Sequence, residues 1–209
     1  MLQPDRAGEL ERLAACIRAC RICVDNPAGR PLPHEPRPVV TPSATAKILI
    51  AGQAPGTKVH LSGMPFSDAS GDRLRDWLGI SSETFYDSHK FAIAAMGFCF
   101  PGQDAKGGDL PPRRECAPVW RTPLLSLMPQ IELVVAIGLY AHAWHIGGQA
   151  RSLTETVKDW RGILERSGGP KIIPLPHPSW RNTGWIRKNP WFETDLLPCL
   201  KTEIAQRLA

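Results

Sequence analysis

The feature that most constrains the fold is a set of four short apolar segments, each followed directly by glycine or proline. They lie at residues 46–51, 91–96, 133–137 and 172–175. Helical patterns separate and flank them, at residues 9–18, 70–78, 116–127, 140–146, 152–160 and from about 190 onward. Ser70 is the expected N-cap of the second of these helices. Strands that alternate with helices favour a mostly parallel sheet with helices on both faces. We therefore expect a three-layer α/β/α sandwich with a mostly parallel four-stranded sheet, as a single domain over residues 1–209.

Two of these predicted strands deliver loops with polar side chains. The first strand runs into GQAPG at residues 52–56 and then into GMPFSDASGD at 63–72, whereas the fourth runs into PHPSWRN at 176–182. Ligands of open α/β sheets bind outside the carboxyl ends of the strands. The two loops are therefore expected to converge on one pocket of small-molecule size.

Charge and composition indicate which partners, which cellular compartment and which cysteine chemistry are compatible with this sequence. The net charge of +5 is compatible with a polyanionic partner without requiring one. No apolar run reaches the about 18 residues of a membrane span, and the N-terminal residues lack the apolar core of a secretory signal. We expect a cytoplasmic protein without membrane contact, in which the six cysteines serve metal binding or burial rather than disulfides.

The string GQAPGTK superficially matches a phosphate-binding loop. That motif needs a Gly-Lys pair followed by Ser or Thr, but Lys58 has no glycine before it and Val59 follows it. The string therefore does not predict a nucleotide hydrolase, although its glycines and proline still let backbone amides approach a ligand.

Three motifs taken together, GQAPG at 52–56, GMPF at 63–66 and HPS at 177–179, resemble the uracil-DNA glycosylase superfamily, and most closely its iron-sulfur branches. The resemblance extends over about residues 20–182. It implies an enzyme that flips a damaged base, with uracil the expected one, out of single- or double-stranded DNA and hydrolyses its N-glycosidic bond. Neither the GQAPG loop nor the HPS loop contains a lysine, which favours a monofunctional mechanism without an imine. We expect the protein to be a monomer.

The resemblance also implies catalytic roles. Cleavage separates an oxocarbenium-like sugar from a base anion, so the site needs a donor at the base and an acid near the sugar. His177 matches the donor. Ala54 stands where the best-known branch has its aspartate, but one branch uses an aspartate in a D-x-x-G-D string, which Asp68 fits. Asp72 in the same string remains the alternative acid.

The other motif residues are predicted to hold the base or the DNA. Phe66 matches the aromatic residue that stacks on the flipped base, and Ala95 stands where the family usually has a base-reading asparagine, which opens the site to a broader or different set of damaged bases. The predicted base-binding residues are Gly52, Gln53, Ala54, Pro55, Phe66 and Ala95. The predicted DNA-contacting residues, which press into the DNA where the base leaves, are Ser179, Trp180, Arg181 and Asn182.

Four cysteines form a further candidate site. Cys20 and Cys23 are a C-x-x-C pair, and Cys99 and Cys116 flank a loop rich in glycine and proline. Four thiolates suit either an iron-sulfur cluster or zinc. The resemblance favours a [4Fe-4S] cluster at these four positions, with Cys16 and Cys199 left outside it.

Two other functions stay open because Ala54 and Ala95 replace polar residues of the family. One is a non-catalytic iron-sulfur protein that binds damaged DNA or abasic sites. The other is a hydrolase that acts on free nucleosides or nucleotides.

Overall fold

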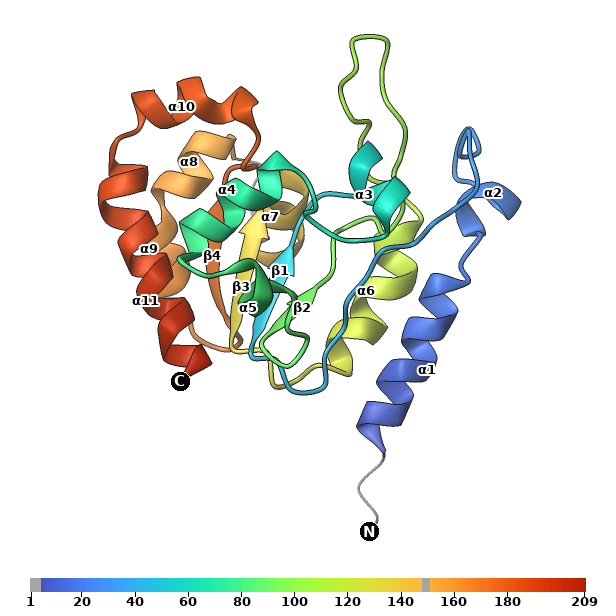
Figure 1. The fold of residues 1–209 in the computed structure, drawn as a ribbon, viewed down its shortest axis with the longest axis horizontal. Coiled ribbons are helices and arrows are strands. Elements are labelled where there is room, and N and C mark those ends of the chain that lie inside the picture. The colour runs from blue at the N-terminus through green and yellow to red at the C-terminus, as the bar shows by residue number, and fades with distance from the viewer. Residues whose placement is uncertain (1–4, 148–150) are drawn as a thin grey trace.

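The protein is built around an all-parallel sheet of four strands in the order β2-β1-β3-β4, in a computed structural model that describes residues 5–147 and 151–209 (Figure 1). The strands are β1 (Ile48–Ala51), β2 (Phe91–Ile93), β3 (Leu133–Ile137) and β4 (Lys171–Leu175). In the register, Ile50 of β1 lies between Ile93 and Val135. All four predicted strands are present in the predicted direction.

Side chains of each strand alternate between two hydrophobic cores. Ile48 and Ile50 face one core, whereas Leu49 and Ala51 face the other. The first core is covered by α4 (Ala69–Leu78), α5 (Ser82–Tyr86), α8 (Leu153–Lys158), α9 (Trp160–Leu164), α10 (Thr183–Lys188), the π-helix η2 (Phe192–Leu196) and α11 (Leu197–Leu208). The second is covered by α1 (Arg6–Arg18), α6 (Cys116–Ser126) and α7 (Leu139–His145). The predicted three-layer α/β/α sandwich is confirmed.

Two of the predicted helices differ from the prediction in ways that the structure explains, and four short helices were not predicted: α2 (Ile22–Asp25), α3 (Thr57–Ser62), α5 and α10. The segment predicted as one helix over residues 152–160 forms α8 and α9, and α8 begins at a capping box between Ser152 and Glu155. For α4 we expected Ser70 as the N-cap, but the cap is Asp68, whose side chain accepts hydrogen bonds from the backbone N–H groups of Ser70 and Gly71. The extended backbone of Asp68 precedes the first turn of the helix, which places its carboxylate over those donors.

The carboxyl ends of the strands lie at one edge of the sheet, where the functional loops gather. This edge carries α3 (Thr57–Ser62) after β1 and the 3₁₀ turn η1 (Trp180–Asn182) after β4. The loop between β2 and α6 projects beyond the same edge in Figure 1. As expected from its glycines and prolines, that loop contains neither helix nor strand, and a bridge between Gln103 and Asp109 closes its outer part.

Among the described residues, none of the helices combines the length and the apolar character that crossing a membrane requires.

Candidate active site

A small cavity of about 80 Å³ lies at the carboxyl end of β1 and adjoins a wider cleft of about 540 Å³. The small cavity is lined by all six predicted base-binding residues, Gly52, Gln53, Ala54, Pro55, Phe66 and Ala95, together with Asp68 and His177. The cleft is lined by Asp68 and His177 as well, and by Ser179, Trp180 and Arg181. The structure therefore brings the two motif loops together, with the two predicted catalytic side chains where the cavity meets the cleft.

Phe66 forms one wall of the small cavity because its backbone is held in an unusual conformation. Its φ angle of 54° lies in the left-handed region that non-glycine residues rarely adopt. The carbonyl of Phe66 accepts hydrogen bonds from Arg75 Nη1 at 3.2 Å and from the Tyr86 hydroxyl at 3.0 Å. A Cβ on Gly71 would lie 1.8 Å from the same carbonyl oxygen, so only glycine fits at that position. These contacts direct the Phe66 ring toward Gly52 at the floor of the cavity.

Replacing Gly71 with alanine is expected to lower the free energy of unfolding by about 2 kcal/mol or more, because the new methyl group overlaps the Phe66 carbonyl. The displaced Phe66 should also slow turnover. Urea denaturation measures the first effect. Gly184→Ala in α10 is the control, because a Cβ there meets nothing within 4 Å. Equal stability of the two variants would contradict this account of the Phe66 turn.

The Asp68 carboxylate caps α4 through one of its two oxygens. Oδ1 accepts from the N–H groups of Ser70 at 3.1 Å and Gly71 at 3.2 Å, and from the Ser70 hydroxyl at 2.5 Å. Every one of these bonds goes to Oδ1, which leaves Oδ2 for a ligand at the junction of cavity and cleft. Asp72 differs: its side chain is 78% exposed, pairs with Arg75 at 2.6 Å, and lines neither cavity nor cleft. The position of Asp68 thus suits a water or a sugar better than that of Asp72.

The loop that carries His177 is fixed by hydrogen bonds from two directions. Asn182 Nδ2 donates to the His177 carbonyl at 2.7 Å, so this predicted DNA contact uses its amide inside the loop. Arg73 of α4 donates to the Ser179 carbonyl at 3.1 Å. Trp180 is left 76% exposed at the rim of the cleft. The sequence motifs gave no indication of Arg73, whose role depends on a contact between distant segments.

Burial lowers the pKa of His177 below its ordinary value, an effect that the carboxylates of Asp68 and Asp109 oppose and that Arg181 reinforces. At neutral pH the imidazole is therefore uncharged. A neutral imidazole has one N–H donor and one acceptor nitrogen. It can therefore donate one hydrogen bond toward a ligand in the cavity without adding a buried charge.

A family model described as the uracil DNA glycosylase superfamily matches residues 38–201 of this chain. The chain belongs to this superfamily. Membership identifies it as a DNA glycosylase, a hydrolase that acts on DNA. The match includes both motif loops and the sheet that carries them, and it begins after Cys20 and Cys23.

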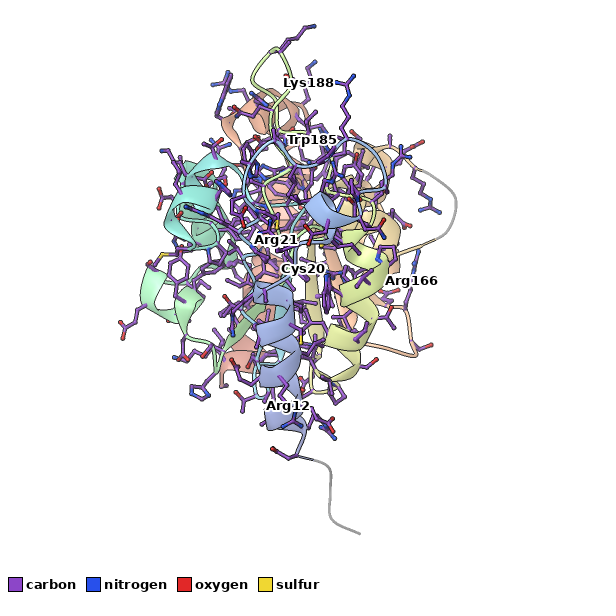
Figure 2. The ribbon with its side chains drawn as sticks, turned by 90° about the vertical axis from the view of Figure 1, so that its right-hand side faces the viewer. Arg12, Cys20, Arg21, Arg166, Trp185 and Lys188 are labelled. Atoms are coloured by element: carbon purple, nitrogen blue, oxygen red, sulfur yellow. The ribbon has the colours of Figure 1, made fainter. Side chains whose placement is uncertain are left out.

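In this superfamily member the four predicted ligand cysteines surround one small cavity of about 10 Å³. Its lining includes Cys20, Cys23, Cys99 and Cys116. Figure 2 shows Cys20 at the end of α1, next to Arg21. Two N–H groups are directed at the sulfurs: Trp120 Nε1 donates to Cys20 Sγ at 3.2 Å, and the Phe98 backbone N–H donates to Cys116 Sγ at 3.4 Å.

The chemistry of this four-cysteine cavity fits a thiolate-ligated centre, although its side chains are not already arranged around a single ion. Over residues 5–147 and 151–209, no group of three or more His, Cys, Asp or Glu side chains is positioned to hold one metal ion. Burial raises the pKa of Cys23 to about 11 and those of Cys99 and Cys116 to about 12, so the free thiols are neutral. Binding of a metal would deprotonate them.

Proposed function

We propose that this protein is a monofunctional DNA glycosylase that excises uracil from DNA by direct hydrolysis. The observation that carries the proposal is the junction of a small cavity, walled by Phe66, with a cleft edged by Trp180 and Arg181. A flipped base would occupy the small cavity while the DNA backbone lies in the cleft. Asp68 and His177 would then stand on either side of the glycosidic bond.

In this arrangement Phe66, His177 and Asp68 have separate roles in a substitution reaction at C1′ of the deoxyribose. Phe66 stacks on the base, and the N–H of His177 donates to a base oxygen as the bond between C1′ and the base nitrogen breaks and its electron pair stays on the base. Asp68 Oδ2 orients a water whose oxygen bonds to C1′. The water gives up one proton and the departing base takes one, so that the products are the free base and an abasic site.

The range of bases is proposed to extend beyond uracil. Ala95 provides no side-chain amide to read the edge of the base, and it lines the small cavity. Recognition is then left to Gln53, His177 and backbone groups of the GQAPG loop. Uracil, hypoxanthine and xanthine all present a carbonyl oxygen to such donors, so we propose all three as substrates, with uracil as the expected base.

We also propose that Cys20, Cys23, Cys99 and Cys116 hold a [4Fe-4S] cluster, with zinc as the alternative occupant. N–H groups directed at the sulfurs of Cys20 and Cys116 support this assignment, because such hydrogen bonds are typical of cluster sites. Hydrolysis of a glycosidic bond transfers no electron. The cluster would therefore join the end of α1 to the loop after β2 rather than take part in the chemistry.

The test is base release from labelled oligonucleotides that carry uracil, hypoxanthine or xanthine, in single- and double-stranded form, followed by alkali to cleave abasic sites. Strand cleavage only after alkali, with uracil as the fastest substrate, supports the proposal. Tight binding without base release would favour the non-catalytic alternative. Release of base from free nucleosides but not from oligonucleotides would favour the nucleoside hydrolase.

Asp68→Asn is expected to slow excision by about 10²-fold while leaving stability nearly unchanged. Asparagine is as good an N-cap as aspartate, so the helix keeps its cap while the site loses a carboxylate. Single-turnover excision and urea denaturation measure the two effects. Asp72→Asn removes an exposed carboxylate from the same helix and serves as the control. A fast Asp68→Asn enzyme together with a slow Asp72→Asn enzyme would transfer the role to Asp72.

A further inference from the structure

Asp109 is a second carboxylate at the junction of cavity and cleft, and no sequence motif includes it. It comes from the loop between β2 and α6, far from both motif loops in sequence, and it lines both the small cavity and the cleft. Its Oδ2 lies 3.3 Å from the position that a Cβ would take on Gly56. The carboxylate therefore lies against the GQAPG loop, in space left free by a glycine.

The loop that carries Asp109 is ordered by its own hydrogen bonds. Gln103 Nε2 donates to Asp109 Oδ1 at 3.3 Å. Asp104 Oδ1 accepts from the N–H groups of Lys106 at 2.8 Å and Gly108 at 2.9 Å, which closes the outer turn. The Asp109 carboxylate is thus held through Oδ1. Because Asp104 closes the outer turn, the geometry of the loop does not depend on the charge of Asp109.

Two further hydrogen bonds connect this loop to the GQAPG loop and to the HPS loop. Gln53 Nε2 donates to the Leu110 carbonyl at 3.5 Å, and Arg181 Nη2 donates to the Gly107 carbonyl at 3.5 Å. The cleft is thus bordered by the Arg181 loop on one side and by the Asp109 loop on the other. DNA that enters the cleft would cover Asp109, which is exposed in the free protein.

We propose that Asp109 is a second catalytic carboxylate that faces the deoxyribose across from Asp68 and stabilises its positive charge in the transition state. The inference rests on the proposed glycosylase function. As the bond between C1′ and the base breaks, the sugar becomes cationic and the base anionic. Asp68 has one oxygen committed to the helix cap, and His177 acts at the base. Asp109 supplies a fixed negative charge on the sugar side, and this charge gains strength when DNA displaces water from the cleft.

The proposal predicts opposite effects on binding and on chemistry. Asp109 lines the cleft that is proposed to hold the DNA backbone, so Asp109→Asn, which removes a negative charge there, should bind DNA as tightly as the wild type or more tightly. The same change should slow single-turnover uracil excision by about 10-fold or more, because stabilisation is lost only in the transition state. The amide oxygen of the new side chain would still accept the hydrogen bond from Gln103, so the loop should keep its shape.

Two abasic-site analogues that differ in charge separate the electrostatic effect of Asp109 from its other effects on binding. One is a DNA strand with a pyrrolidine in place of the sugar, which is cationic like the transition state. The other carries a neutral tetrahydrofuran. The wild type should bind the cationic analogue more tightly, and Asp109→Asn should lose about 10-fold of that preference while its affinity for the neutral analogue is unchanged or stronger.

Asp104→Asn is the matched control, because it removes the same charge from the same loop at a residue that lines neither cavity nor cleft. Wild-type rate and analogue preference in Asp109→Asn would overturn the role of Asp109 and leave the proposed function intact. Equal weakening for both analogues and for DNA would also overturn it, because that is the pattern of a purely structural residue. Failure of the wild type to release any base would overturn the proposed function and this role together.

Discussion

His177→Ala is expected to slow single-turnover excision of uracil by about 10²-fold or more. A single donor aimed at developing negative charge contributes about 3 kcal/mol to transition-state stabilisation. His177 lines the small cavity, and its loop is held by Asn182 and Arg73, which do not depend on the imidazole. The fold and the affinity for DNA should therefore change little, since most of that affinity comes from phosphate contacts.

The measurement is the excision rate at enzyme excess, with DNA affinity determined in parallel. His89→Ala, at an exposed histidine that lines neither cavity nor cleft, is the control. The pH profile adds a second readout: because burial holds the His177 pKa below 6.5, its neutral form persists as the pH falls through 6.5. The wild-type rate should stay level there and decline only at lower pH. An unchanged rate in folded His177→Ala would remove His177 from the mechanism.

The sheet was predictable because each strand is an apolar run within a buried sheet, and the two ends of β3 coincide with the prediction. The ends of the strands were less predictable where side chains form hydrogen bonds with the backbone groups next to the strand. The first strand begins at Ile48 rather than at residue 46, because the N–H of Ala46 donates to Ser43 Oγ at 2.8 Å. The second ends at Ile93, after which the carbonyls of Ala94 and Ala95 accept hydrogen bonds from buried Arg121. Such contacts between distant segments leave no periodic signal in the sequence.

The candidate site, too, contains residues that could be predicted from the sequence and a residue that could not. Residues within the GQAPG, GMPF and HPS strings were predicted together and line one site, because the strings lie in loops that leave the carboxyl ends of β1 and β4. Asp109 was missed because its loop has no motif, and the position of that loop depends on hydrogen bonds from Gln53 and Arg181, far away in the sequence. The cap of α4 was misplaced because aspartate and serine are both good N-caps. In the structure the backbone of Asp68 is extended, whereas Ser70 already lies in the first turn of the helix.

Cys99→Ser is expected to bleach the protein and to reduce its soluble yield sharply. Cys99 is buried and shares its cavity with Cys20 and Cys23 of the N-terminal segment and with Cys116 at the start of α6. This cavity joins the segment after α1 and the start of α6 to the loop after β2, which contains neither helix nor strand. A metal centre that binds only the folded chain contributes its binding energy to folding, so loss of one ligand should cost most of that energy.

Anaerobically purified wild-type protein should be brown, with broad absorbance at about 400 nm and about four irons per chain. Cys20→Ser, Cys23→Ser and Cys116→Ser should behave like Cys99→Ser. Cys16→Ser and Cys199→Ser should keep colour and yield, because neither sulfur lines the four-cysteine cavity. Colourless protein with one zinc per chain would retain the ligand set and reject the cluster. Wild-type protein without iron or zinc would reject both. The four thiols, of which Cys20 is partly exposed, would then only pack the segment after α1 against the loop after β2 and the start of α6.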